Sequence, residues 1–318
     1  MNNKAVWDYR NPYLWRDKVE EEGFAPLMIE VAVSSEFFGK ESCPGLPESD
    51  EELLDAVGAA YRAGAVICRI LPKDPAHPSK NSVDPAHLSR INRAIRERCP
   101  GMIINSCLNG GLEVMRGYNT AAIAAEEKPD LASLRAGIPL LGLDLPARSA
   151  ELGDEREARH IDANLITAYG AIRQTVQAVS SAGILPVLEL YQPGQYMVVL
   201  DLIRHGLLPS PILLDMLFGF DCFNYAHPAK FMDMLRELPP DCIYFSGATG
   251  AYQLPMNLMS MISGGHVRVG LGDSFLLGRE KEAESSAEQV ERIVRMAGEM
   301  DRPVATVQQA REMLGLKG

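Results

Sequence analysis

Apolar residues along the chain gather in short runs that are separated by longer stretches of mixed composition. The runs are rich in Ile, Leu and Val, which is typical of strands buried on both faces of a parallel sheet. We predict a strand at each of eight runs, at residues 27–33, 65–71, 102–108, 131–136, 184–190, 211–217, 242–248 and 266–272.

Several of the stretches between these runs carry the spacing of an amphipathic helix. Residues 49–64 read SDEELLDAVGAAYRAG, in which Ser49 is the expected N-cap and Glu52, three residues later, completes a capping box. Further helices are predicted at residues 84–99, 160–183, 228–238 and 285–300.

Strands and helices alternate along the whole chain, and no change in composition marks a linker, so we predict an α/β fold of the (β/α)8 TIM-barrel class. A doubly wound sheet is disfavoured because no glycine-rich phosphate-binding turn follows an early strand. We expect residues 1–318 to form a single barrel domain, with an N-terminal arm at about 1–25 and a C-terminal helical extension at about 303–318. The charged segment 142–159 is long enough to be an active-site lid or an oligomer contact.

The chain is acidic, with a formal net charge of −11 over 318 residues, of which 47% are hydrophobic. An acidic protein is a poor partner for nucleic acid or for an anionic membrane, but a local cationic pocket still permits a small anionic substrate. The six cysteines form no CxxC pair, and we find no signal peptide or membrane-spanning run, so we expect a reducing, cytoplasmic location.

Charged residues at the carboxyl ends of the predicted strands are the first candidates for an active site, because this is where barrels of this class place their chemistry. They are Arg69 in AVICRILPKD, Glu189 in LPVLELYQPG, and Arg268 and Asp273 in RVGLGD. A buried charge without a role is costly, which favours a functional interpretation of Glu189. Arg268 and Asp273 are either a catalytic pair or a structural pair that shapes the glycine turn between them.

Hydroxyl and thiol groups at other strand ends are further candidates: Ser106 and Cys107 end the third strand, and Ser133 lies on the fourth. Cys107 is interpreted as a passive core thiol, because no nearby histidine is available to lower its pKa. No HxH, HxxE or CxxC spacing occurs, so we predict no dedicated metal site.

Residues 263–316, which begin SGGHVRVGLGDSF, carry the most specific motif of the chain, and supporting motifs lie upstream of it: GATGAYQLP (247–255), LPVLELYQPG (185–194), KPDLASLRAG (128–137), IINSCLNGG (103–111) and AGAVICRILPKD (63–74). Together these segments resemble the β-keto acid cleavage enzymes, whose best-known activity is 3-keto-5-aminohexanoate cleavage. The resemblance implies a (β/α)8 barrel that binds zinc and condenses a keto acid with acetyl-CoA before cleaving a C–C bond. It also implies a homo-oligomer, either a dimer or a tetramer.

The resemblance assigns roles to individual residues. Arg268 and Asp273 fall on the family's arginine and catalytic aspartate, and Glu189 falls on its strand-five glutamate. Ser133 stands where a hydroxyl residue is expected. Cys107, with Ser106 before it, occupies the position of a serine or threonine, or a one-residue gap gives that position to Leu108 instead.

The departures from the family pattern concern the metal. The two histidine positions of strand two hold Arg69 and Leu71, and the strand-eight glutamate ligand is replaced by Gly272. A further glutamate expected after strand one falls on Phe37, with Glu36 beside it.

These departures suggest that Arg69 puts a fixed positive charge where the family holds a metal ion, with Glu30 on strand one as its partner. The equally weighted alternative is that Arg69 only fills the barrel in a structural ion pair. The first functional hypothesis is a metal-independent enzyme of C–C bond chemistry on a small keto acid or related anion, with or without acetyl-CoA as co-substrate.

In this hypothesis Asp273 moves the proton, and Arg268 orients Asp273. Glu189 and Ser133 position the substrate, and Arg69 binds a carboxylate. The second hypothesis is a non-catalytic or ligand-binding member of the family. The third is zinc-dependent cleavage with ligands from other positions.

Overall fold

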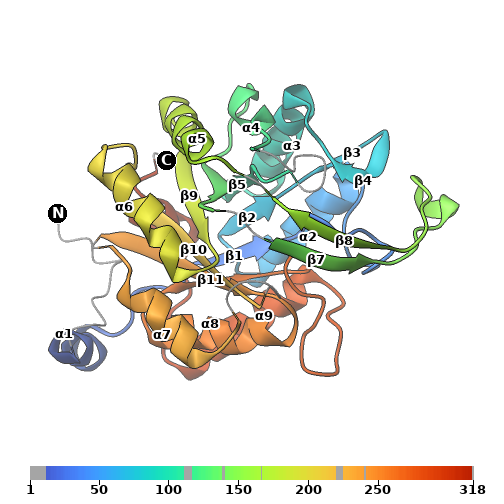
Figure 1. The fold of residues 1–318 in the computed structure, drawn as a ribbon. Helices are drawn as coiled ribbons and strands as arrows, with labels where there is room; N and C mark the ends of the chain where they lie inside the picture. Colours follow the sequence, from blue (N-terminus) through green and yellow to red (C-terminus); the bar gives the residue numbers. More distant parts are fainter. Residues whose placement is uncertain are drawn as a thin grey trace.

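The structure is a computed structural model that describes residues 12–110, 117–137, 140–165, 167–219, 225–239 and 241–316. Eight parallel strands close into a barrel, in the order β1, β2, β5, β6, β9, β10, β11 and β12 (Figure 1). Their bounds are β1 Ile29–Ala32, β2 Ile67–Ile70, β5 Ile103–Cys107, β6 Leu131–Arg135, β9 Leu185–Leu190, β10 Ile212–Phe218, β11 Cys242–Ala248 and β12 His266–Val269. Each coincides with one of the predicted runs, so the predicted TIM-barrel class is confirmed.

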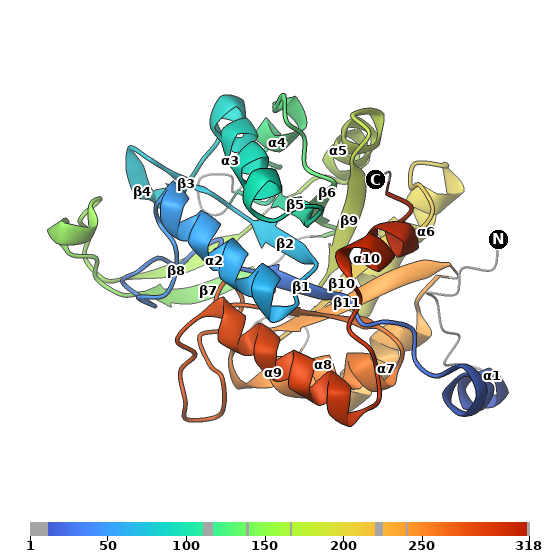
Figure 2. The ribbon, with the colours of Figure 1, turned by 180° about the vertical axis from the view of Figure 1, so that it is seen from behind.

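Helices pack around the outside of the barrel (Figure 1 and Figure 2). Their bounds are α2 Asp50–Ala63, α3 Pro85–Arg98, α4 Ala121–Ala124, α5 Tyr169–Ser181, α6 Tyr196–Arg204, α7 Pro228–Arg236, α8 Gln253–Ile262 and α9 Ser286–Glu299. Ser49 caps α2 as predicted, since its side chain accepts a hydrogen bond from the Glu52 amide in a complete capping box. No helix in the described part of the chain is long and apolar enough to cross a membrane.

The last helix, α10 (Val307–Leu314), covers the amino-terminal end of the barrel (Figure 2). Its Ala310 and Leu314 pack with Met28, Ile67 and Leu213, which lie at the starts of their strands. This apolar layer closes one end of the barrel, so most of the charged side chains inside the barrel lie towards the other end.

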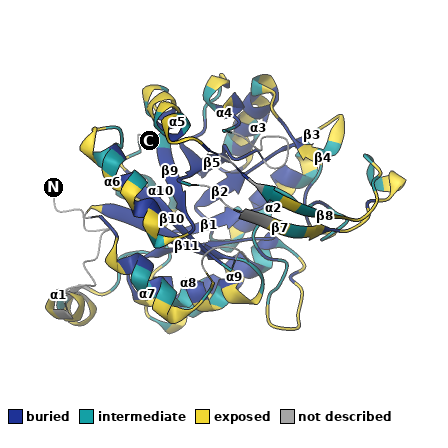
Figure 3. Cartoon of the chain, viewed as in Figure 1, coloured by how far each residue is buried: buried dark blue, intermediate teal, exposed yellow. Residues whose placement is uncertain are grey.

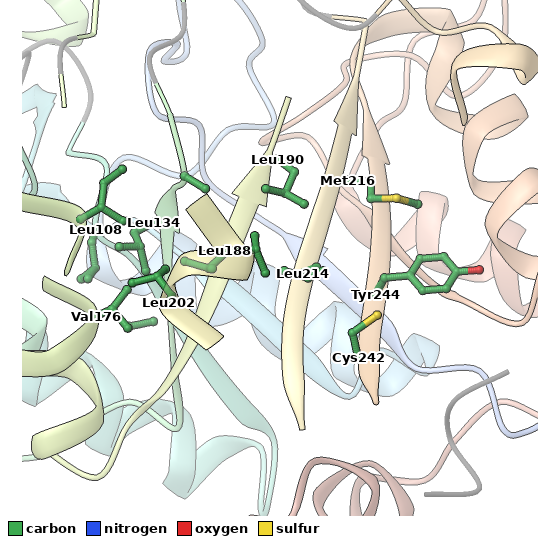
Figure 4. Packing of buried hydrophobic residues seen from close by; sticks show 14 of the residues in the cluster. Leu108, Leu134, Val176, Leu188, Leu190, Leu202, Leu214, Met216, Cys242 and Tyr244 are labelled. Atoms are coloured by element: carbon green, nitrogen blue, oxygen red, sulfur yellow. The ribbon is translucent and has the colours of Figure 1, made fainter. Parts of the chain in front are cut away.

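Alternation along each strand separates an apolar exterior from a polar interior. The outward residues of β6, β9 and β10, such as Leu134, Leu188 and Leu214, pack against Val176 of α5 and Leu202 of α6 (Figure 4). Full burial of a leucine or valine side chain contributes about 1.5–3 kcal/mol, so this packing fixes the face that each strand turns inward. The strands are accordingly buried, whereas the helices expose their outer faces (Figure 3).

The prediction is wrong between residues 140 and 168, where the charged loop and the start of a long helix were expected. An antiparallel hairpin, β7 (Leu140–Leu145) and β8 (Arg159–Asn164), extends from the barrel (Figure 1), and α5 begins only at Tyr169. His160, Ile161 and Asp162 alternate between exposed and half-buried positions, as a two-stranded ribbon requires and a helix does not. The role of segment 142–159 as a lid or an oligomer contact stays a prediction.

The hairpin is anchored by a buried arginine. Arg148 Nη1 lies 2.6 Å from Glu41 Oε2 and 2.8 Å from Glu48 Oε1, and both carboxylates belong to the segment between β1 and α2. Arg156 also binds Glu41. A second small ribbon, β3 (Lys73–Asp74) and β4 (His77–Asn81), follows β2.

Two short segments precede the barrel, the helix α1 (Pro12–Asp17) and the π-helix η1 (Lys18–Glu22). The chain then joins the barrel through Leu27, whose amide donates to the Pro303 carbonyl at 2.7 Å, and through Ala25, whose carbonyl accepts from Arg302 Nε. Within the described residues, short 3-10 helices lie at Ala150–Leu152, Pro193–Gln195 and Gly250–Tyr252. The single-domain organisation with an arm and an extension remains our prediction.

Candidate functional site

Three arginines project into the carboxyl end of the barrel, Arg69 from β2, Arg135 from β6 and Arg268 from β12. All three are buried, each less than 5% exposed. A buried guanidinium is tolerated only when carboxylates and hydrogen bonds compensate for its lost hydration. The interior of the barrel therefore has to supply several acidic partners.

Glu189 on β9 is the central acidic partner and is fully buried. Its Oε1 accepts from Arg69 Nη2 at 2.8 Å and lies 3.4 Å from Arg268 Nη1. Its Oε2 accepts from Asn109 Nδ2 at 2.6 Å and from the Tyr191 hydroxyl at 3.0 Å. Burial favours the neutral acid, but Arg69 and Arg268, with the Asn109 hydrogen bond, outweigh it and lower the pKa of Glu189 to about 2.

Asp273 is held by Arg268 through a fork of two parallel hydrogen bonds. Arg268 Nε lies 2.7 Å from Asp273 Oδ2, and Nη2 lies 2.7 Å from Oδ1. The remaining nitrogen, Nη1, donates to Asp215 Oδ2 at 2.9 Å. A fork of this kind fixes the plane of the carboxylate as well as its position. Asp273 follows β12 in a turn, so the arginine inside the barrel determines where this loop carboxylate points.

Arg69 uses Nη2 for its hydrogen bonds to Glu189 and to Cys107 Sγ, the latter at 2.8 Å. The expected pairing with Glu30 is not formed, because the Glu30 side chain instead accepts from Asn105 Nδ2 at 2.6 Å. Arg69 Nε is buried and has no hydrogen-bond partner in the described part of the chain. Burial raises the pKa of the Cys107 thiol to about 12, so the sulfur is an uncharged contact of the guanidinium at neutral pH.

The two candidate serines lie on different faces of the barrel wall. Ser133 pairs in register with Cys107 and Val187, which face the interior, and its hydroxyl has no partner among the described residues. Ser106 lies on the same strand face as Ile104 and Leu108, which pack against the helices. The structure therefore brings Ser133, but not Ser106, to the interior charged group.

Three residues of the buried charged network, Tyr191, Asn109 and Arg135, were not among the site residues predicted from the sequence. Tyr191 follows Glu189 by two positions, and the alternation of a strand would have placed both on the same face. Asn109 comes after the end of β5, where no pattern predicts direction. Arg135 pairs with Glu36 at 2.6 Å, a contact between distant segments that sequence spacing does not reveal.

The residues at the family's metal positions do not fit a zinc site. Arg69 is a cation, Leu71 has no donor atom, and a Cβ added at Gly272 would lie 2.4 Å from the Ser34 carbonyl oxygen. A glutamate side chain therefore has no room at position 272 without a backbone shift. Within the described residues, no group of three His, Cys, Asp or Glu side chains is arranged to hold a metal.

The depressed pKa of Glu189 predicts how stability depends on pH. Its folded-state pKa of about 2 lies below the ordinary value of 4.5, so its contribution is fully present above pH 4.5 and is lost as the pH falls towards 2. We expect wild type and Glu189→Gln to differ most in free energy of unfolding above pH 4.5, and the difference to shrink in acid. Urea unfolding at several pH values tests this, and a constant difference would contradict it.

A closed (β/α)8 barrel with charged side chains gathered at the carboxyl ends of its strands is the architecture of a large class of enzymes. Within that class, a model of the beta-keto acid cleavage enzyme family matches residues 26–316. The chain belongs to this family, as its motifs predicted.

Curated relatives of known name match over nearly their full length. The chain is 27% identical over 291 residues to 3-keto-5-aminohexanoate cleavage enzyme of Acetoanaerobium sticklandii, covering 91% of this chain and 98% of that protein. It is 28% identical over 303 residues to 3-oxoadipate:acetyl-CoA acetyltransferase of Cupriavidus necator, covering 92% and 95%. These names support the prediction of an acyltransferase that cleaves C–C bonds.

A solved structure shares the fold. ObcA, in a ternary complex with a C4-CoA adduct and oxalate, superposes with a TM-score of 0.65 at 16% identity. The match covers 86% of this chain and 68% of that chain. At this identity the likeness supports the barrel fold alone.

Proposed function

We propose that this protein transfers an acyl group between a small β-keto acid and acetyl-CoA, cleaving a C–C bond, with the fixed charge of Arg69 in place of the family's metal ion. The relatives named as acetyl-CoA transferases support the reaction class. The observation that carries the metal-free form is the Arg69 guanidinium, held by Glu189 at one of the family's metal-ligand positions.

Asp273 is the group that we assign to proton transfer. A hydrogen on the carbon between a ketone and a carboxylate is acidic, and a carboxylate held in one orientation accepts it efficiently. Because Arg268 holds both oxygens of Asp273, the carboxylate enters the reaction already oriented.

Arg69 is assigned to the negative charge of the substrate. Both of its observed hydrogen bonds use Nη2, so the donors on Nε and Nη1 are the ones available to an anion. A fixed guanidinium in a poorly solvated site stabilises a carboxylate or an enolate oxygen more strongly than it would in water. The hydroxyl of Ser133, which has no partner among the described residues, is assigned to substrate positioning.

The alternative is a non-catalytic or ligand-binding member of the family, and one observation favours it. All three nitrogens of Arg268 are occupied by Asp215, Glu189 and Asp273, which also satisfies a purely structural network. We further propose a cytoplasmic homo-oligomer, a dimer or a tetramer, which light scattering will test. Cys43, Cys68, Cys99 and Cys107 are buried and form no disulfide, which supports a reducing location.

The proposed function predicts that the activity survives metal removal. Purified protein treated with a chelator and checked by elemental analysis should consume acetyl-CoA with a panel of β-keto acids at the rate of untreated protein. About one tightly bound zinc per chain, with activity lost on its removal and restored by zinc, would contradict the metal-free proposal. Absence of turnover and of any ligand-induced thermal shift would favour the non-catalytic alternative.

A further inference from the structure

Two buried carboxyl groups inside the barrel have no part in the mechanism above. They are Glu30 on β1 and Asp215 on β10, both at most 2% exposed. Each has one satisfied oxygen, because Asn105 Nδ2 donates to Glu30 Oε1 at 2.6 Å and Arg268 Nη1 donates to Asp215 Oδ2 at 2.9 Å. The other oxygen of each, Glu30 Oε2 and Asp215 Oδ1, is buried and has no hydrogen-bond partner among the described residues.

The same guanidinium lies next to both groups. Glu30 is the register partner of Arg268 in the pairing of β1 with β12, and Asp215 binds Arg268 directly. Burial and the charge of Glu30 raise the pKa of Asp215 well above its ordinary range. Burial also raises the pKa of Glu30, although Arg268 opposes the shift. Two carboxyl groups that share a poorly solvated space do not both ionise at neutral pH.

The surrounding charges are already balanced without this pair. The charged groups that act on it from the neighbouring strands and turn are Arg69, Glu189, Arg268 and Asp273. His266 is the nearest titratable side chain on β12 towards the amino-terminal end, in register with Phe245, which is in turn in register with Asp215. Two guanidiniums therefore oppose two carboxylates, and burial, with the charge of Arg302, lowers the pKa of His266 so that its ring is neutral. A doubly ionised Glu30 and Asp215 would add two uncompensated negative charges, whereas one shared proton halves that cost.

We propose that Glu30 and Asp215 share a single proton between Glu30 Oε2 and Asp215 Oδ1, as a carboxylic acid paired with a carboxylate beneath the anion-binding arginines. The pair positions no substrate atom itself. It limits the negative charge below Arg69 and Arg268, and so keeps the site receptive to an anion. The effect of the pair on anion binding rests on the proposed function, whereas the shared proton does not.

Infrared spectroscopy tests the shared proton without any ligand. Wild type at neutral pH should show the C=O stretching band of one buried protonated carboxyl, and this band should shift in D2O. The band should vanish in Glu30→Gln and equally in Asp215→Asn, because the remaining carboxyl, next to Arg268 and free of its like-charged neighbour, ionises. The control Glu127→Gln, which alters a half-buried partner of Arg96 outside the barrel interior, should retain the band.

Two outcomes of this measurement would overturn the pair. Absence of the band from wild type would mean that no proton is held there. Persistence of the band in either variant would mean that the proton belongs to one carboxyl alone or to another group. The first outcome is read from wild type alone, so it does not depend on the folding of the variants.

Binding of acetoacetate, the simplest β-keto acid, tests the consequence for the site. Loss of the shared proton in alkali adds one negative charge within about 10 Å of the bound anion, so the affinity of wild type should fall roughly tenfold by calorimetry. Glu30→Gln and Asp215→Asn each keep one carboxyl group that is already ionised, so their affinity for acetoacetate should not fall in alkali. The affinity of Glu127→Gln should fall as that of wild type does. An equal decline in all four proteins would overturn the role of the pair. Absence of acetoacetate binding at every pH would count against the proposed function and leave the infrared result to decide the pair.

Discussion

Replacing Arg69 by methionine should lower the free energy of unfolding by about 3 kcal/mol or more, because it leaves the buried Glu189 carboxylate without its nearest counter-charge. Methionine fills much of the volume of the arginine side chain, so the loss reports the charge rather than a cavity. Glu189 retains Arg268, Asn109 and Tyr191, which places the expected loss at the lower end of the range for a broken buried pair. Urea unfolding at neutral pH measures it.

Two companion variants separate the possible causes. Arg69→Lys keeps the positive charge, and its loss should be clearly smaller than that of Arg69→Met. The double variant Arg69→Met with Glu189→Gln removes both charges, and its loss should be smaller than the sum of the two single losses by about 0.5–3 kcal/mol. Additive losses would show that Arg69 and Glu189 do not depend on each other, contrary to their 2.8 Å contact.

Asp273→Asn should lower turnover of a β-keto acid by about 10²–10⁴, the usual contribution of a positioned proton-transferring group. The amide cannot accept the proton, and its NH2 group faces one nitrogen of the Arg268 fork. The stability loss should be modest, about 1.5–3 kcal/mol, because Arg268 keeps Asp215. Steady-state acetyl-CoA consumption measures the loss of turnover, and thermal unfolding of the same protein measures the loss of stability.

The surface variant Asp233→Asn, on α7, is the matched control, because it makes the same chemical change at a residue that pairs with the surface cations Lys230 and Arg236. It should leave turnover unchanged. Turnover that survives Asp273→Asn would remove Asp273 from the mechanism. A large loss of stability with unaltered turnover per folded molecule would assign to Asp273 a structural role alone.

The barrel was predictable because its strands are encoded locally. Runs such as AVICRIL and PILLDML are apolar except for one charged residue each, so the eight strands and their order along the chain follow from the sequence. The hairpin β7–β8 was not predictable in the same way. It is anchored by Arg148 to Glu41 and Glu48, about 100 residues earlier in the chain, and no local pattern reports such a contact.

The sequence allowed us to predict which residues gather at the site, but not which of them bind one another. Strand ends and motif resemblance placed Arg69, Glu189, Arg268 and Asp273 at one end of the barrel, and the structure brings these four together. The choice of partners was not predictable, because it depends on side-chain reach across the barrel. Arg69 reaches Glu189 from β2 to β9, whereas Glu30, on the strand adjacent to β2, binds Asn105 instead.

The close approach of the turn after β12 to β1 also bears on the evolution of this protein. A Cβ at Gly270 would lie 2.1 Å from the Ala32 carbonyl oxygen, and a Cβ at Gly272 would lie 2.4 Å from that of Ser34. Restoring the family's ligands would thus require histidines at 69 and 71, a glutamate at 272, and a displaced backbone to admit that glutamate. Exchange of side chains alone therefore does not rebuild that ligand set, because the glutamate also requires the turn after β12 to move away from β1.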